Sequence, residues 1–284
     1  MGPQGHEVRP RPASIFIGYE DYFLLERHTF GRKAGHKWTV SIAMSSPNLP
    51  HIRRRGLLAR LARAIVLLVA AIVLLPYAIT PLYFVLPPVS TPMLWRLATG
   101  QRLARTYVAL EAISPALPLT VIAAEDARFC SHAGIDWTEL RLMMEETDEF
   151  GELRGVSTIT QQTAKNLFLW PGRSYLRKAL ELPLSLWIDF VLPKRRILEI
   201  YLNVAEWGPN GEFGAEAGSR RAFGKSARDV NWREAALLAA ILPNPIRRDA
   251  RQPGPAVRRL AAIHESRAAS SPALGSCLRA RRSP

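Results

Sequence analysis

Two adjacent carboxylates, Glu125 and Asp126, directly follow the apolar run 119–124. Burying an acid pair at the end of an apolar segment costs free energy unless the acids are paired or used in a reaction. Such a pair could supply a general base, whereas the simpler alternative is two exposed acids that end a helix. Phe129 and His132 follow within seven residues and could support a base at this position.

A second polar cluster begins at Ser157, which follows Gly155 by two residues and suits a helix N-cap. On a helix that starts there, Thr158, Gln162 and Lys165 lie at positions i, i+4 and i+7 and share one face. That face would present one cation to an anion, and the dipole of the helix N-terminus would favour the same ligand. The alternative is an ordinary solvated stripe.

A third segment starts at Arg173 and Ser174, and it places Arg177 and Glu181 four residues apart. This spacing predicts an ion pair on one helix face, for which a surface role is the simpler alternative. Pro183 follows two residues later, and we expect it to kink the helix or to end its regular hydrogen bonding.

The elements that must position these residues are mainly helical. Apolar spacing predicts helices over 95–113, 119–125 and 194–206, and a last helix that Asn231 and Glu234 cap and that ends before Pro243. Asp136 with Glu139 resembles a further capping box. Residues 147–154 predict an exposed loop, and Asn203 and Glu206 receive no role.

Composition limits the partners and the redox chemistry of the chain. The 284 residues include 38 Lys and Arg against 24 Asp and Glu, a formal net charge of +14, which favours nucleic acid, phospholipid head groups or phosphates as partners. The two cysteines, Cys130 and Cys277, show no metal-type spacing. Because one lies near the acid pair and the other in a polar tail, we expect both to be free thiols.

Residues 64–86 form an uncharged apolar run of 23 residues. As a helix this run rises about 34 Å, which exceeds a hydrocarbon core of about 30 Å. Tyr77 and Tyr83 lie toward its far end, where aromatic side chains favour the membrane interface. Five arginines precede the run, so we expect a cytoplasmic N-terminus and an external C-terminal part. A cleaved signal peptide is the alternative.

Four ordered motifs resemble the signatures of the peptidoglycan glycosyltransferases, glycosyltransferase family 51. They read Glu125-Asp126-x-x-Phe129-x-x-His132-x-Gly134-x-Asp136, Gly155-x-Ser157-Thr158-Ile159-Thr160-Gln161-Gln162-x-x-Lys165-Asn166-Leu167, Arg177-Lys178-x-x-Glu181 and Arg196-Ile197-Leu198-Glu199-x-Tyr201-Leu202-Asn203. The resemblance covers roughly residues 95–248. The chain ends soon after Pro245, so it resembles the monofunctional biosynthetic members, which lack a penicillin-binding half.

This resemblance implies a mostly α-helical, lysozyme-like fold preceded by one transmembrane helix. It also implies polymerisation of the lipid-linked disaccharide-pentapeptide, lipid II, by inverting transfer, with release of undecaprenyl pyrophosphate. Glu125 would be the base, and Glu181 would orient Arg177, stabilise charge at the donor or help to hold Mg²⁺ or Mn²⁺. No cofactor is firmly implied. The implied substrate-binding residues are Asp126, Phe129, His132, Ser157, Thr158, Gln161, Gln162, Lys165, Asn166 and Arg177.

On this interpretation the chain divides into a poorly ordered cytoplasmic segment, a transmembrane anchor, a glycosyltransferase domain and a basic, disordered tail, over residues 1–56, 57–88, 89–250 and 251–284. Met44 is a candidate natural start. The expected location is the inner membrane, with the catalytic domain in the periplasm. The expected partners are lipid II, the growing glycan chain, membrane phospholipid and other wall-synthesis proteins, without nucleic acid.

Two other functions remain open at this point. A lytic hydrolase of peptidoglycan also uses a glutamate, but as an acid that cleaves the glycosidic bond. Such an enzyme has no need of the two cations Lys165 and Arg177. A basic, membrane-anchored binding protein for nucleic acid is the other alternative, which the outward-facing topology argues against.

Overall fold

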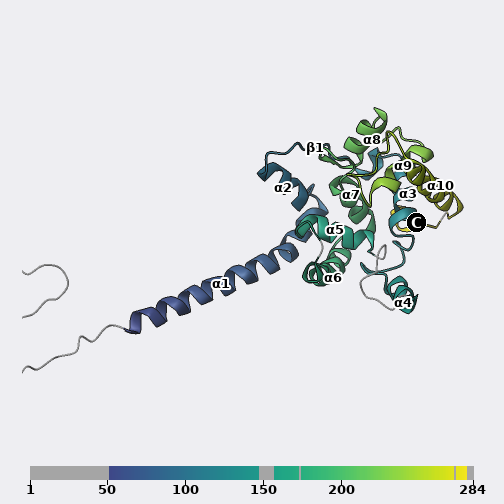
Figure 1. Ribbon diagram of the computed structural model, residues 1–284. Coiled ribbons are helices and arrows are strands. Elements are labelled where there is room, and N and C mark those ends of the chain that lie inside the picture. The colour runs from purple at the N-terminus through teal and green to yellow at the C-terminus, as the bar shows by residue number, and fades with distance from the viewer. Residues whose placement is uncertain (1–50, 147–156, 173, 272, 280–284) are drawn as a thin grey trace, which may run out of the picture. The chain divides into compact units, whose positions relative to one another are not determined.

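The computed structural model describes residues 51–146, 157–172, 174–271 and 273–279, and helices dominate this part of the chain (Figure 1). The helices are α1 (His51–Ile79), α2 (Thr91–Ala98), α3 (Ala116–Glu125), α4 (Trp137–Glu146), α5 (Ile159–Phe168), α6 (Tyr175–Val191), α7 (Lys194–Val204), α8 (Ala215–Phe223), α9 (Trp232–Ile241) and α10 (Pro255–Ser270). Short 3-10 helices are η1 (Thr80–Phe84), η2 (Leu110–Ala112) and η4 (Ser276–Leu278). The expected mostly α-helical class is confirmed.

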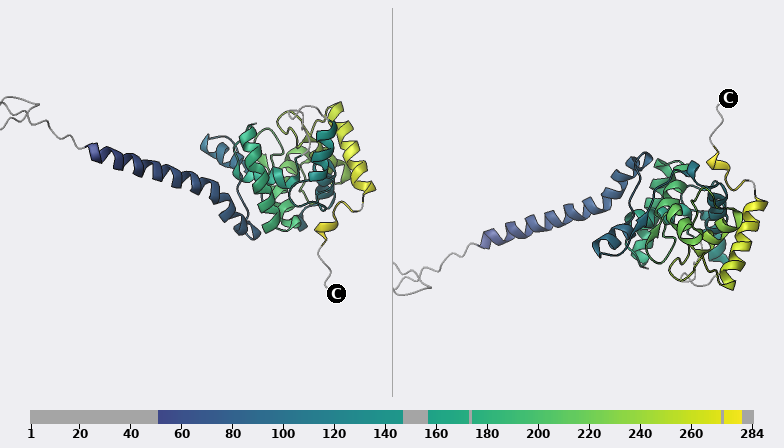
Figure 2. Two further views of the ribbon diagram at one scale, coloured as in Figure 1. Left: turned by 90° about the horizontal axis from the view of Figure 1, so that it is seen from below. Right: turned by 90° about the horizontal axis from the view of Figure 1, so that it is seen from above.

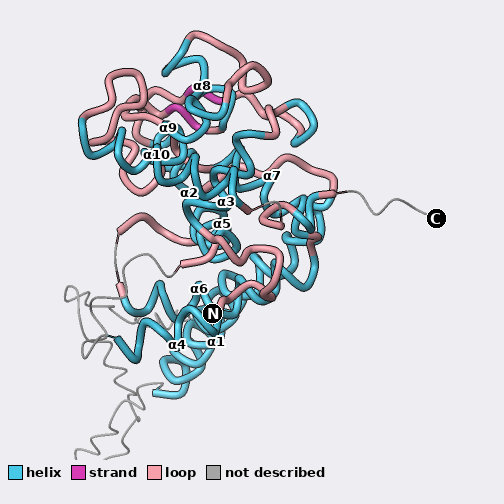
Figure 3. Tube along the Cα trace, turned by 90° about the vertical axis from the view of Figure 1, so that its right-hand side faces the viewer, coloured by secondary structure: helices cyan, strands magenta, loops and turns pink. Residues whose placement is uncertain are grey.

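The strand content of the described chain is small. Two strands of two residues each, β1 (Ala104–Arg105) and β2 (Glu212–Phe213), pair in parallel with Ala104 opposite Glu212 (Figure 3). Residues 1–50, which include the candidate start Met44, and the expected loop 147–154 lie outside the described residues.

One helix of the described chain is long and apolar enough to cross a membrane. It covers Gly56–Phe84, and Pro76 lies inside it without ending α1. Almost all of its large apolar side chains are exposed, which a membrane span requires and a core helix does not. The predicted apolar run over 64–86 therefore corresponds to the C-terminal two thirds of this helix.

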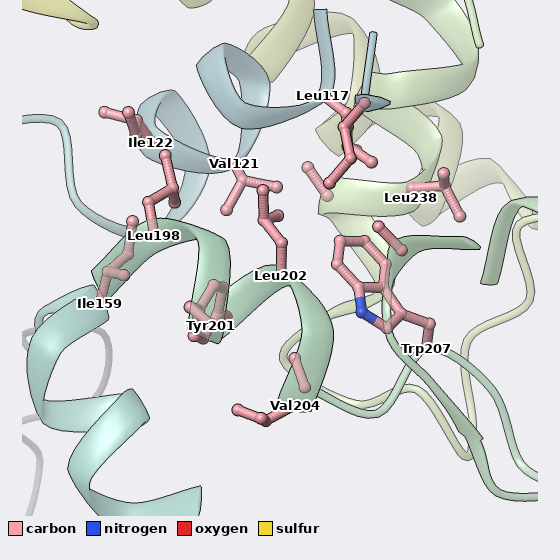
Figure 4. Close-up of a cluster of buried hydrophobic side chains, with 14 of the residues drawn as sticks. Leu117, Val121, Ile122, Ile159, Leu198, Tyr201, Leu202, Val204, Trp207 and Leu238 are labelled. Carbon is pink, nitrogen blue, oxygen red and sulfur yellow. The ribbon is translucent and has the colours of Figure 1, made fainter. Parts of the chain in front are cut away.

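The apolar core surrounds α3. Leu117, Val121 and Ile122 of this helix are fully buried, and they lie near side chains of α5, α7 and α9 (Figure 4). Full burial of one such side chain stabilises the fold by about 1.5–3 kcal/mol. The helix α3 is apolar nearly throughout and ends at Glu125. This charged residue therefore lies next to the apolar core.

The helix predicted over 95–113 is wrong for most of its length. The helix in this region, α2, ends at Ala98, and Gly100 follows with φ +68°, a left-handed conformation that suits glycine and stops a helix. Further on, Val108 lies outside any helix and is bonded to α7, where the Asn203 side chain accepts from its N–H and donates to its carbonyl, both at 2.8 Å. Tertiary contacts therefore override the helical spacing.

Pro183 does not end the helix that carries Glu181. The helix α6 continues through it to Val191, with Leu184, Ser185 and Ile188 buried in the turns that follow. Pro183 itself is exposed. The buried residues beyond the proline hold the helix in place although one backbone N–H is missing.

The C-terminal region departs from two expectations. The tail predicted to be disordered over 251–284 contains α10, which packs on α9 and α3 along the outside of the domain (Figure 2). Val257, Ala261 and Ala268 are the buried residues of this helix. The expectation of free thiols is also wrong, because Cys130 and Cys277 form a disulfide. Their 147-residue separation gave the sequence no local signal of pairing.

Candidate active site

The candidate base, Glu125, is the last residue of α3. Its Oε2 atom accepts a hydrogen bond of 2.7 Å from Nε2 of Gln162, which lies on α5. The Tyr201 hydroxyl of α7 donates to Oε1 of the same amide at 3.1 Å. Because the amide oxygen is engaged by Tyr201, its N–H group faces the carboxylate, and three helices together orient the glutamate.

Burial raises the pKa of Glu125 above its ordinary value. The hydrogen bond from Gln162 and the charges of Lys165 and Arg248 act in the opposite direction, while Asp126 raises the pKa further. Burial outweighs the other effects. A carboxylate with a raised pKa is a stronger base, and this is the tuning that general base catalysis near neutral pH requires.

Asp126 holds the loop after α3 to the start of α5. Its two oxygens lie 2.9 and 3.0 Å from Nε2 of His132, and its Oδ2 accepts from the backbone N–H of Ile159 at 2.9 Å. Asp126 and His132 are both nearly inaccessible as side chains. The carboxylate also lies at a helix N-terminus, where the dipole favours its charge. Asp126 therefore positions neighbouring groups, and Glu125 is the better candidate for the reacting acid.

The helix α5 begins one residue later than expected, with Thr158 rather than Ser157 as its N-cap. Thr158 and Gln161 form a capping box, and the Thr158 hydroxyl donates to the Gly134 carbonyl at 2.6 Å. Both side chains are buried and are occupied by these protein contacts. These contacts favour a role in shaping the site over the expected contact with substrate. Ser157 is half-buried and accepts from Nζ of Lys178 at 2.9 Å.

Lys165 interacts electrostatically with both candidate acids, Glu125 and Glu181. Desolvation by burial has the largest effect on its pKa and lowers it; Arg177 and Lys178 also lower it, whereas Glu181 and Glu125 raise it. The lysine therefore lies within the electrostatic reach of both carboxylates. A largely buried cation within the electrostatic reach of two acids is suited to an anionic ligand that arrives in the same site.

The predicted ion pair between Arg177 and Glu181 is wrong, because Glu181 pairs with Lys178 instead. Glu181, which is 2% exposed, pairs with Lys178 at 2.7 Å through the i, i+3 spacing. Within the described chain, the Nε atom of Arg177 is buried and has no hydrogen-bond partner. A buried donor without a partner is costly, so this guanidinium is a candidate for binding an anion.

Phe129 and Asn166 stand apart from the other candidates. Phe129 is fully buried, with Nζ of Lys194 4.7 Å from its ring centroid, and this burial favours a packing role over the expected contact with substrate. Asn166 is half-buried near the end of α5, where its backbone carbonyl accepts from the Thr91 hydroxyl.

Sequence reasoning missed three residues near the site. Lys178 adjoins Arg177 in the third motif. A second cation beside the first was the feature of the sequence that could have marked Lys178 as a site residue. Tyr201 was assigned to the core from its helical spacing, which the structure confirms, but its hydroxyl also orients Gln162. Arg248 follows α9, and no motif marked it before the structure placed its charge near Glu125.

The residues around Glu181 do not fit a protein-held divalent cation. Mg²⁺ and Mn²⁺ prefer several oxygen ligands, whereas this carboxylate is paired with Lys178 and lies in the field of Lys165. No group of three His, Cys, Asp or Glu side chains in the described ranges could hold a metal ion.

Comparisons with known proteins identify the family of this chain. Residues 93–267 match the family model described as Transglycosylase. A biosynthetic peptidoglycan transglycosylase of Nitrobacter hamburgensis is 62% identical over 200 residues, which cover 70% of this chain and 88% of that protein. Proteins with the same description from Rhodopseudomonas palustris strain TIE-1 and Rhizobium meliloti are 59% and 51% identical, over 74% and 67% of this chain and 89% and 80% of theirs. The chain belongs to the transglycosylase family, glycosyltransferase family 51.

Proposed function

We propose that this peptidoglycan glycosyltransferase of cell wall synthesis uses Glu125 to extend a glycan chain with lipid II. The observation that carries the proposal is the group formed by Glu125, Gln162 and Lys165. In it a carboxylate with a raised pKa receives an oriented hydrogen bond, and a desolvated cation lies within reach of this acid and of Glu181.

Glu125 would remove the proton from the 4-hydroxyl of the acceptor sugar. The freed oxygen attacks the anomeric carbon of the donor from the face opposite the pyrophosphate, and the new glycosidic bond forms as the carbon–oxygen bond to pyrophosphate breaks. The configuration at that carbon is therefore inverted. Undecaprenyl pyrophosphate leaves with the bonding electrons, and the proton stays on Glu125 until solvent accepts it.

The leaving pyrophosphate gains negative charge, so it needs cations that are already in position. Lys165 supplies a point charge, and Arg177 supplies a planar fork whose buried Nε has no partner in the described chain. Lys178 is exposed enough to turn from Glu181 toward a phosphate, and Ser157 adds a hydroxyl beside it. Glu181 would hold these cations in place and favour positive charge at the donor carbon.

A lysozyme-like hydrolase of peptidoglycan is not favoured. Hydrolysis of a neutral sugar linkage requires an acid and a water, whereas three cations around Glu181 would serve no purpose in that reaction. The similar proteins are described as biosynthetic.

We further propose a single span in the inner membrane, with a cytoplasmic N-terminus and a periplasmic catalytic domain, because five arginines precede the uncharged run 64–86. The end of this helix contacts the catalytic domain. The Trp187 indole N–H donates to the Tyr77 carbonyl at 3.0 Å, and Arg196 Nε donates to the Tyr83 carbonyl at 2.7 Å. These contacts bring α6 and α7 next to the bilayer surface from which a lipid-linked substrate and neighbouring phospholipid would be met. Other wall-synthesis proteins would meet the enzyme at the same surface.

The test is incubation of the purified, full-length protein with labelled lipid II, followed by electrophoresis of the products. We expect polymer from the wild type and a loss of at least about 100-fold in rate from Glu125→Gln, because the amide cannot accept the proton. Glu145→Gln, which changes an exposed acid of α4, is the matched control and should polymerise normally. Absence of polymer from the wild type, or normal turnover by Glu125→Gln, would refute the proposal.

A further inference from the structure

The loop that follows the candidate base is covalently joined to the far end of the described chain. Cys130 lies five residues after Glu125, and its disulfide partner Cys277 lies in η4. Their Cα atoms are 5.4 Å apart, although 147 residues separate them in sequence. The bond therefore ties the loop 126–135, here called the base loop, to a C-terminal segment.

The base loop connects several helix ends at the site. Asp126 bonds to the first N–H group of α5 at Ile159, and the Gly134 carbonyl accepts from the cap residue Thr158. Asp136, which follows the loop, accepts from the N–H groups of the first turn of α4. A displacement of the base loop would therefore move the start of α5 relative to the end of α3, and with it the distance between Gln162 and Glu125.

The C-terminal segment 274–278, here called the strap, contacts α7 and α3. Arg195 of α7 donates to the Leu278 carbonyl at 3.0 Å. Gly275 is buried, and a Cβ atom placed there would lie 2.6 Å from Cδ2 of Leu119, so the strap lies directly on α3. The strap thus packs against α3, the helix that ends at Glu125, and the disulfide joins the strap to the base loop that follows Glu125.

We propose that the disulfide-bonded strap positions the catalytic base, and that Cys130 and Cys277 are positioning residues of this enzyme. The proposal rests on the proposed function because polymerisation is its main readout. A dithiol such as dithiothreitol would release the strap. The sulfur–sulfur bond breaks, each cysteine sulfur receives a proton from the reagent, and the reagent loses two electrons to become a cyclic disulfide.

Reduction of the full-length enzyme should lower kcat about 10- to 100-fold, since a misplacement of about 1 Å of a reacting group costs rates of this order. The KM for lipid II should change by less than about twofold, because the strap is proposed to act on the reacting base and not on the cations that bind the pyrophosphate. The double variant Cys130→Ser/Cys277→Ser should show the same loss without reductant. Dithiothreitol should have no further effect on this variant, which makes it the matched control.

The pH profile separates positioning from a general loss of stability. A released strap admits water to Glu125 and brings its pKa closer to the ordinary value, so the acidic limb of kcat should move to lower pH. A fold that is only less stable would lose rate at every pH with the limb unmoved, and circular dichroism at the assay temperature measures that loss. The groups that face the carboxyl are Gln162 and Lys165 from α5, Tyr201 from α7, Arg248 after α9 and Asp126 from the base loop.

The proposal would be overturned if mass spectrometry found two free thiols in the unreduced protein. It would also be overturned if kcat and its acidic limb were unchanged after reduction. Should the double variant not fold, the reduced wild type and Arg195→Ala, which removes the hydrogen bond to the strap at Leu278 beside the disulfide, provide the same test. Should the oxidised wild type make no polymer, the proposed function fails separately. Hydrogen exchange in residues 126–135 then tests the role of the strap. We expect exchange to be at least tenfold faster after reduction. An unchanged exchange rate would reject the role of the strap.

Discussion

At the scale of single residues, the chemistry of the site comes from the surroundings of one glutamate. Glu125 ends an apolar helix, and burial is the largest cause of its raised pKa. Gln162 donates to the charged form and so limits the rise. The carboxylate is consequently a stronger base than an ordinary glutamate, as removal of a proton from a sugar hydroxyl requires.

Replacing Gln162 with Leu should raise the pKa of Glu125 further, because a hydrogen bond to the charged form is lost. The base works only when ionised, so activity rises with pH through this pKa and the acidic limb of kcat/KM should move to higher pH. We expect a movement of about one pH unit, which corresponds to a hydrogen bond to the charged group worth about 1.4 kcal/mol. Tyr201→Phe should give a smaller movement in the same direction. An acidic limb that stays in place in both variants would contradict this account.

Lys165 and Arg177 should act on the pyrophosphate rather than on the sugars. Replacing either with Ala should weaken the binding of undecaprenyl pyrophosphate by roughly 10- to 100-fold, the range expected for one charge-assisted hydrogen bond. Product inhibition constants and the KM for lipid II measure this effect. Arg228→Ala, at an exposed arginine, is the control and should bind normally. Unchanged affinity in both test variants would remove the proposed role.

At the scale of elements, the cap of α5 determines where the polar face of that helix points. Thr158 receives the Gln161 N–H group and also donates to the carbonyl of Gly134 in the base loop. Gln162 and Lys165 follow on the same helix. The cap therefore fixes the rotation of these side chains and the distance of the helix from the base loop.

Thr158→Ala should destabilise the protein by about 1–2 kcal/mol, the usual cost of losing an N-cap. It should also lower kcat several-fold at temperatures where the variant is folded, since the Gly134 contact is lost as well. Asn231→Ala removes an exposed capping box at the start of α9 and is the matched control. We expect a similar fall in melting temperature for the control, with its kcat unchanged. Equal kcat values for both variants would show that this cap has no part in the site.

Side chains of the fourth motif, on α7, form hydrogen bonds to non-helical segments of the chain. Glu199 accepts from the Leu110 N–H group at 3.1 Å and from the Tyr107 hydroxyl at 2.8 Å, and Asn203 bonds to both backbone groups of Val108. Arg196, on the same helix, donates to the Tyr83 and Leu86 carbonyls at 2.7 and 2.8 Å. One face of α7 thus holds both the exit from the anchor and the segment that follows α2.

Local features were predictable from the sequence where the physical cause is local. The shared face of Gln162 and Lys165 follows from helical spacing alone, and the α9 cap follows from Asn231 and Glu234. Spacing could not decide between Arg177 and Lys178 as partner of Glu181, since i, i+3 and i, i+4 pairs are both allowed on a helix. Deciding it requires the tertiary position of α6.

Features that depend on distant parts of the chain were missed for a related reason. The Cys130–Cys277 bond and the docking of α10 on α3 join segments more than 100 residues apart, and neither leaves a periodic pattern that identifies its partner. The segment 103–110 was predicted to be helical because its own spacing allows it, and the side chains of α7 decide otherwise.

At the scale of the whole molecule, the anchor and the catalytic domain are joined by more than a peptide linker. Trp187 donates to the Tyr77 carbonyl, and the rings of these two residues lie 6.0 Å apart. Tyr83 stacks on Phe168, which is the last residue of the helix that carries Lys165. The end of the anchor is therefore in contact with both α5 and α6, and its orientation is coupled to the site.

Trp187→Phe removes the indole N–H and keeps an aromatic ring, so it tests the coupling with little loss of packing. We expect a loss of about 0.5–1.5 kcal/mol in stability, the net value of one hydrogen bond. We also expect a broader distribution of distances between spin labels at positions 67 and 233, which are exposed on α1 and α9. Because both native cysteines are joined to each other, labels attach to introduced cysteines.

The same variant should use lipid II in a bilayer several-fold less efficiently, because a lipid-linked substrate reaches the site only when the domain keeps its height and tilt at the surface. With a water-soluble, short-chain analogue the loss should disappear, since that substrate does not depend on the bilayer. Trp95→Phe changes an exposed indole of α2 and should leave both the distances and the rates unaltered. Equal losses with the bilayer and the soluble substrate would mean that Trp187 acts within the catalytic domain and not on its orientation.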